Sequence, residues 1–331
     1  MKQYRLPVAA LLALLVASLR AELPPDAQSA MEKGVLAAQQ QDFALAAKFF
    51  AEAREFAPEA PELLYNLGLA ESKIPGRELR AIAWFGAYLA ANPAAPNAKA
   101  VKKQMDALDV TSQINTTKFI KTVVDAAKLL HAPDHPNPGG LIMPYMGGPL
   151  HEAAVLLARN GETAEALKIA AAIKDPRWRS WAQAGIAMAL ALDGDRTGAD
   201  KFRRLSAQTD TSFAPSNWDM VLANITGRIG PALKTIESDF AGTLKSGDRW
   251  TVLHAQLQRQ TASSAQDWIA LNTLVMSEPI FTDFTATLET LPKGKASDTF
   301  RALRYAASGI LDLRAVVTRM MKMQRAKQIK S

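Results

Sequence analysis

The sequence predicts an all-α protein in which helical hairpins stack side by side in two arrays. Alanine recurs throughout the 331 residues, while aromatic residues make up only 7%. Alanine has the highest helix propensity and is depleted in strands. Small residues return at intervals of 33 to 35 residues in two parts of the chain, which indicates a repeat architecture. No stretch reads as a run of alternating strands.

The first 21 residues have the features of a secretory signal. Lys2 and Arg5 form a basic start, and an apolar run of 13 residues follows from Pro7 to Leu19. That run suits a signal peptide and is shorter than the roughly 20 residues of a membrane span. We expect cleavage after Ser18 or Ala21, with an uncleaved N-terminal anchor as the alternative. In either case the bulk of the chain is exported, to the periplasm or the medium.

The first repeat family consists of two units between about residues 27 and 95. Each unit has a glycine, then an alanine, a phenylalanine four residues after the alanine, and a proline twelve residues after it. These residues are Gly34, Ala46, Phe50 and Pro58 in the first unit, and Gly68, Ala81, Phe85 and Pro93 in the second. The second unit carries one extra residue near Pro75 and Gly76.

This pattern resembles the tetratricopeptide repeat, a hairpin of two helices termed A and B. The resemblance implies that the glycines and alanines let helices approach closely and that the phenylalanines fill the gap between hairpins. It also implies that the prolines mark the end of each helix B, because proline cannot continue a helix.

A second repeat family follows, with Gly161, Gly194 and Gly227 spaced 33 residues apart. An alanine stands five residues after each glycine, at positions 166, 199 and 232, and one more period reaches Gln260 with alanine at 265. These units resemble degenerate tetratricopeptide hairpins. We expect each glycine to end a helix A in the left-handed conformation.

Between and after the arrays, other segments complete the chain. We expect a helix at 112–130, then a connector at 131–149 whose prolines and glycines forbid regular structure. Further helices are expected at 280–291, 296–307 and 309–327. The predicted organisation is a leader at 1–21, an array at 22–110, a helix and connector at 111–150, an array at 151–278, and C-terminal helices at 279–331.

The C-terminal segment is basic and amphipathic. Its apolar positions are Ile310, Leu313, Val317, Met320 and Met321, and its cations are Arg314, Arg319, Lys322, Arg325, Lys327 and Lys330. We consider three roles: a helix that caps the array, an adaptable partner surface, and peripheral contact with an anionic membrane. The basic leader and this tail account for the net charge of +7. The body is nearly neutral, so no nucleic-acid partner is expected.

Several kinds of chemistry have no support in the sequence. There is no cysteine, which excludes disulfides, thiolate chemistry and a lipoprotein anchor. His131 and His135 flank Asp134, and His151 follows, but Pro133 and Pro136 break any helix between them. No serine lies in a nucleophile elbow, and no phosphate-binding or zinc motif is present. We therefore expect no cofactor, no metal site and no catalytic residue. The six tryptophans are expected to pack between helices.

The predicted binding site follows from the resemblance alone. Helix A of a tetratricopeptide hairpin faces a concave groove, and the matching positions here are Gln28, Met31, Val35, Tyr65, Asn66, Leu69 and Lys73. The amide of Asn66 can donate and accept hydrogen bonds at once, and Lys73 can pair with an acidic chain end. The alternative is that these positions form a solvated helix face or pack under another helix.

The sequence thus indicates a non-enzymatic scaffold or adaptor that binds a protein or peptide in the bacterial cell envelope. A fold alone does not fix a function, and two alternatives stay open. One is a cell-wall-active enzyme, or its accessory subunit, built on a helical solenoid. The other is a structural component that uses the basic tail at a membrane. The oligomeric state is not predicted.

Overall fold

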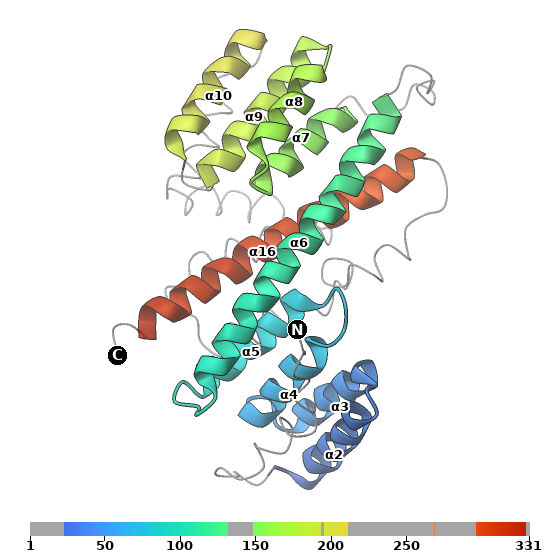
Figure 1. Cartoon of the computed structure of the whole chain (residues 1–331), viewed down its shortest axis with the longest axis vertical. Helices are drawn as coiled ribbons and strands as arrows, with labels where there is room; N and C mark the ends of the chain where they lie inside the picture. Colours follow the sequence, from blue (N-terminus) through green and yellow to red (C-terminus); the bar gives the residue numbers. More distant parts are fainter. Residues whose placement is uncertain (1–22, 132–147, 193–194, 211–267, 269–295, 329–331) are drawn as a thin grey trace, which may run out of the picture. The chain divides into compact units, whose positions relative to one another are not determined.

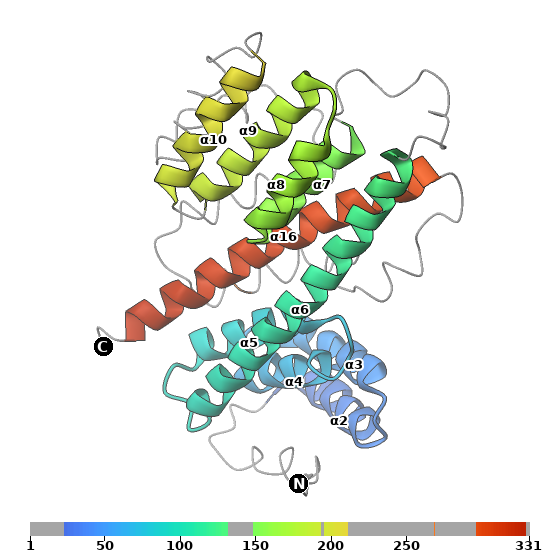
Figure 2. The ribbon, with the colours of Figure 1, turned by 45° about the horizontal axis from the view of Figure 1, so that its top comes forward.

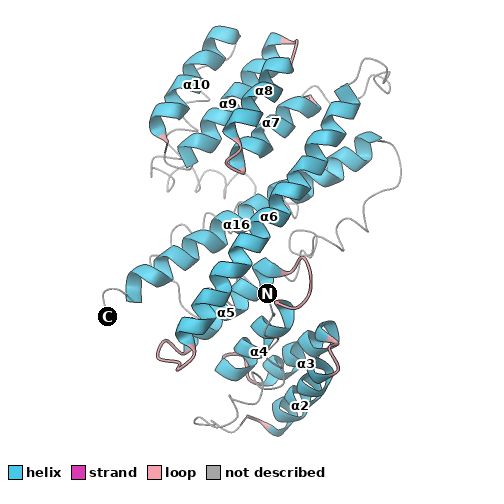
Figure 3. Cartoon of the chain, in the orientation of Figure 1, coloured by secondary structure: helices cyan, strands magenta, loops and turns pink. Residues whose placement is uncertain are grey.

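A computed structural model describes residues 23–131, 148–192, 195–210, 268 and 296–328. These residues form ten α-helices and no strand, as Figure 3 shows, which confirms the all-α prediction. Within them, no helix combines the length and apolarity needed to cross a bilayer. The leader, the connector and the repeats at Gly227 and Gln260 lie outside the described residues.

The chain divides into two compact units. Unit 1 comprises Met1–Ser112, Thr261–Thr285 and Val317–Ser331, and unit 2 comprises Gln113–Gln260 and Ala286–Val316. Helix α6 (Ala98–His131) begins in unit 1 and ends in unit 2, whereas α16 (Ala296–Gln328) begins in unit 2 and ends in unit 1.

Unit 1 contains two helical hairpins, drawn in blue to cyan in Figure 1 and Figure 2. The first is α2 (Pro25–Gln39) with α3 (Phe43–Phe56), and the second is α4 (Pro61–Glu71) with α5 (Glu78–Ala91). Helix α3 also packs against α4. Helices α3 and α5 each end two residues before a proline, Pro58 and Pro93, because the residue before proline is disfavoured in a helix.

The two helices of each hairpin in unit 1 meet at a glycine. A Cβ atom added to Gly34 would lie 2.5 Å from a ring carbon of Phe50, and one added to Gly68 would lie 2.6 Å from Phe85. The phenylalanines therefore fill the space within each hairpin. Each ring lies directly against the glycine in the first helix of its own hairpin.

Unit 2 contains four consecutive helices. They are α7 (Pro149–Arg159), α8 (Thr163–Ala172), α9 (Pro176–Leu192) and α10 (Arg196–Thr209). Helix α7 packs against both α8 and α9, and α9 packs against α10. The predicted small residues Ala166 and Ala199 are buried, as are their counterparts in unit 1, Ala46 and Ala81.

The hairpin turns repeat one hydrogen-bonding pattern. The N–H of Glu162 donates to the carbonyl of Leu157 (2.9 Å), and 33 residues later the N–H of Asp195 donates to Leu190 (2.9 Å). Gly161 has a φ of +84°, which confirms the left-handed glycine that ends helix A. Gly194 lies outside the described residues.

The first hairpin makes the same turn without a glycine. The N–H of Asp42 donates to Ala37 (3.0 Å), and Gln41 occupies the left-handed position with a φ of 64°. Asp42 then caps α3 by accepting a hydrogen bond from the N–H of Leu45 (3.0 Å), as expected for an N-cap aspartate.

Helices α6 and α16 are longer than the sequence indicates. The expected helix at 112–130 starts at Ala98, so the predicted boundary near residue 110 falls inside α6. The expected helices at 296–307 and 309–327 are one helix, with Ser308 and Gly309 in its interior. An interior glycine costs about 1 kcal/mol. The complete burial of Ala307 and Ile310 on either side outweighs that cost.

We expect Gly34→Ala to destabilise unit 1 by about 1–3 kcal/mol, because the added methyl group overlaps a buried ring. Urea unfolding followed by circular dichroism measures the change. Gly148→Ala is the matched control, since nothing lies within 4 Å of a Cβ at that position. Equal losses in the two variants would show that the glycine contact is unimportant.

We expect Gln41→Gly to stabilise the protein by about 0.5–1 kcal/mol. A non-glycine residue in the left-handed region costs about 1–2 kcal/mol, and the greater freedom of glycine in the unfolded chain offsets only part of the gain. Gly161→Ala at the matching turn should destabilise. Thermal unfolding of both variants tests the pair, and a lower melting temperature for Gln41→Gly contradicts the turn assignment.

Candidate functional site

The α2 positions of the predicted groove have unequal exposure. Gln28 is exposed, and its amide donates to Glu32 one turn later (3.2 Å). Met31 is partly buried and packs against the core cluster of Ala30, Ala53 and Leu63, which joins α2 to α3 and α4. Val35 is also partly buried. Helix α2 therefore offers one exposed polar side chain beside half-covered apolar ones.

Tyr65 lies in the core of the second hairpin. Its side chain is 6% exposed, and its ring centroid is 5.9 Å from that of Phe85 and 5.1 Å from that of Tyr88. Burial raises the pKa of the Tyr65 phenol, while a hydrogen bond with Asn97 lowers it. The ring therefore supports the packing of α4 on α5 and does not face the solvent as a groove residue would.

The remaining predicted positions of the second hairpin lie on α4 and in the turn that follows it. Asn66 and Leu69 are partly exposed and lie three residues apart on one face of α4. Lys73 is exposed in the turn two residues after α4 ends. Neither Asn66 nor Lys73 has a hydrogen-bond or ion-pair partner in the part of the chain that the structure describes. We call Asn66, Leu69 and Lys73 the α4 stripe.

Helix α6 contacts the C-cap residue of α4 beside this stripe. Gln104 of α6 donates to the hydroxyl of Ser72 (3.3 Å), and that hydroxyl donates to the carbonyl of Leu69 (2.7 Å). Ser72 is not one of the predicted groove positions. The side chains of the α4 stripe itself stay accessible.

A buried ion pair fixes the end of α4 from which Lys73 projects. Glu71 and Arg80 approach to 2.9 Å, with side chains that are 2% and 6% exposed, and Arg77 lies 3.5 Å from the same carboxylate. Removing one partner of such a pair is costly because it leaves a buried charge uncompensated. Sequence reasoning missed this pair because its members belong to different helices of the hairpin.

The C-terminal helix buries its apolar positions within the chain. Ile310, Leu313 and Val317 are fully buried, and Met320 and Met321 are nearly so. In unit 1, Gln324 donates to the carbonyl of Gly86 on α5 (3.1 Å). Of the three roles considered for this segment, packing on other helices accounts best for these contacts.

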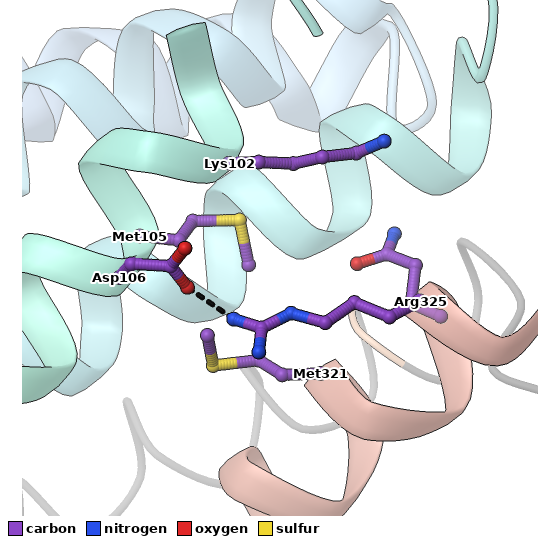
Figure 4. A pocket seen from close by; sticks show the side chains of 6 residues that line it. Lys102, Met105, Asp106, Met321 and Arg325 are labelled. Carbon is purple, nitrogen blue, oxygen red and sulfur yellow. Dashed lines mark hydrogen bonds and ion pairs between the residues drawn. The ribbon is translucent and has the colours of Figure 1, made fainter. Parts of the chain in front are cut away.

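A shallow hollow lies beside the end of α16 in unit 1. Its lining residues are Lys102, Met105, Asp106, Met321, Gln324 and Arg325. Figure 4 shows Asp106 and Arg325 joined as an ion pair, with Met105 and Met321 to either side. The ion pair of Asp106 with Arg325 joins α6 to α16, so the hollow has the character of a contact between helices.

Unit 2 contains an aromatic cluster around a histidine. The ring centroid of His151 lies 6.4 Å from that of Trp178 and 6.3 Å from that of Trp181, and the two indoles are 6.3 Å apart. Burial lowers the pKa of His151 to about 4. Trp84 and Trp268 are buried, as expected of packing residues, whereas Trp181 is 45% exposed.

The described residues do not place three or more histidine, aspartate or glutamate side chains together as a metal site would require. Asp134 and His135 lie outside those residues. Comparison with protein-family models, with curated proteins and with solved structures gave no match. Among the groove positions predicted from the sequence, those of the α4 stripe include polar side chains that are accessible and have no partner among the described residues.

We expect the stability of unit 2 to fall as the pH decreases from about 6.5 towards 4. The pKa of His151 is lower in the folded state than its ordinary value of 6.5, so the unfolded state binds the proton more tightly in this window. The loss is about 2–3 kcal/mol. Urea titrations at several pH values measure it.

His151→Phe keeps a ring beside the indoles and should flatten this pH dependence. Burial raises the pKa of Glu152 by more than Arg304 lowers it. Protonation of Glu152 therefore stabilises the folded state as the pH falls, which is opposite in sign to the effect of His151. Because Glu152 is unchanged in the variant, the difference between parent and variant isolates His151. Identical pH profiles would exclude the proposed effect.

Proposed function

We propose that this chain is an exported helical-repeat scaffold that binds a protein or peptide partner through the α4 stripe. The α2 residues Gln28, Met31 and Val35 have the same three-and-four spacing as the stripe and supply a second accessible face. Export is part of the proposal and depends on the leader at 1–21. The N-terminal sequence of the mature protein, beginning at residue 19 or 22, is its direct test.

The proposal is supported by two polar groups, one on α4 and one in the turn after it, that have no partner among the described residues. Asn66 presents an amide that can both donate and accept, and Lys73 presents an ammonium group with three donors. Leu69 lies between them in the sequence and adds a partly exposed apolar side chain. This combination suits a peptide segment that has an apolar side chain and a carboxylate, either an acidic residue or the chain end.

The surroundings keep the ammonium of Lys73 available. The carboxylate nearest in sequence, Glu71, is buried and paired with Arg80 and Arg77. Lys73 is exposed and has no acidic partner among the described residues. An exposed ion pair with a ligand contributes modestly, roughly 0–1 kcal/mol, so the amide of Asn66 and the apolar contact at Leu69 must supply specificity.

We expect Asn66→Ala/Lys73→Ala to weaken partner binding at least about tenfold, which corresponds to 1.4 kcal/mol. The mature parent and the variant serve as parallel baits in affinity capture from envelope extract. Circular dichroism checks that the variant is still helical. The matched control is Lys121→Ala, which removes an exposed cation from α6 in unit 2.

A protein retained by the parent and by Lys121→Ala, but lost by the double variant, supports the proposal. Synthetic peptides from that protein, with free and amidated C-termini, then distinguish a chain end from an internal acidic residue. Equal capture by all three baits contradicts binding at the α4 stripe. Release of muropeptides by the purified protein would favour the alternative of a cell-wall enzyme.

A further inference from the structure

The first hairpin exposes large apolar side chains on the face turned away from the second hairpin. Leu45 and Phe56 of α3 are 39% and 48% exposed, and Leu36 of α2 is 57% exposed. The opposite face of α3 carries Arg54, whose guanidinium lies 5.1 Å from the ring centroid of Trp84 on α5. Large apolar side chains that are exposed close together often mark a protein–protein contact.

These side chains come from both helices of the first hairpin. Leu45, Phe49 and Phe56 are four and seven residues apart and share one side of α3. The ammonium of Lys33 on α2 lies 6.0 Å from the ring centroid of Phe49, and Leu36 is one turn after Lys33. We call Leu36, Leu45, Phe49 and Phe56 the α2–α3 surface.

The charges on the exposed side of α3 are divided between its two halves. Lys48 is in the first half, and Glu52 and Glu55 are in the second, and all three are exposed. Neither Lys48 nor Glu52 makes an ion pair with a described residue. An identical helix in antiparallel orientation would bring Lys48 opposite the glutamates, whereas a parallel one would bring like charges together.

We propose that the α2–α3 surface binds a second copy of this chain, with the two α3 helices antiparallel. A two-fold axis near residues 50 and 51 places Leu45 of each copy against Phe56 of the other. It also places Lys48 of each copy near Glu52 and Glu55 of the other. The interface is isologous, so each favourable contact occurs twice.

The expected dimer is weak. A helix of 14 residues is about 21 Å long, and a face two helices wide is smaller than the ~800 Å² per partner of a standard interface. We therefore expect a dissociation constant in the micromolar range. Self-association requires no other partner, so it can be tested whether or not the α4 stripe binds one.

Sedimentation velocity of the purified mature chain tests the association over about two decades of micromolar concentration. The parent should shift from monomer to dimer with concentration. Phe56→Glu should raise the dissociation constant at least about tenfold. The control Leu129→Glu, at an exposed leucine on α6, should behave as the parent. A monomeric parent over the whole range, or undiminished association of Phe56→Glu, would overturn the proposal.

Disulfide trapping tests the orientation, because the natural chain has no cysteine. Leu45→Cys and Phe56→Cys chains are oxidised separately and as an equal mixture. In the antiparallel arrangement, the two copies of position 45 are about 16 Å apart along the helix axis, and so are the two copies of position 56. That distance is beyond the reach of a disulfide. The mixture should therefore give the disulfide-linked dimer and the separate variants should not. Dimers from each variant alone indicate parallel helices, and either this result or no disulfide at all contradicts the arrangement.

Discussion

The close contact between a glycine and an aromatic ring organises the first half of this protein. In both hairpins of unit 1, the ring of a phenylalanine on the second helix occupies the space where a Cβ of the first helix would be. The two helix axes can therefore approach closely, and fully buried alanines on the second helix complete the contact. Unit 2 uses the same principle elsewhere: a Cβ on Gly185 of α9 would lie 2.2 Å from a methyl group of Val155 on α7.

This packing decides which side chains remain accessible. Tyr65 faces the aromatic core between α4 and α5, and the buried carboxylate of Glu71 is paired with arginines. Those two positions cannot contact a partner without breaking the core. Asn66 on α4 and Lys73 in the turn after it are left accessible. In the first hairpin, the contact of Arg54 with Trp84 likewise turns the stripe of Leu45 and Phe56 outward.

Local patterns in the sequence predicted much of the fold. The helical class, the buried alanines and the left-handed Gly161 each follow from the residue type and its immediate neighbours. One prediction failed because burial decides it: α16 continues through Gly309. The turn at Gln41 could not be recognised because it lacks the usual glycine. The cluster of His151 with Trp178 and Trp181 joins residues that are far apart in sequence, and only the packing of α7 on α9 brings them together.

We expect a partner to contact the α4 stripe. Site-specific photo-crosslinking in cells tests it most directly, with a photoreactive phenylalanine analogue in place of Leu69 and, as a control, in place of the exposed Leu129 of α6. We expect a discrete crosslinked product from position 69 that is absent from position 129 and is lost when Asn66 and Lys73 are replaced by alanine. The same products from both positions, or none from position 69, would contradict it.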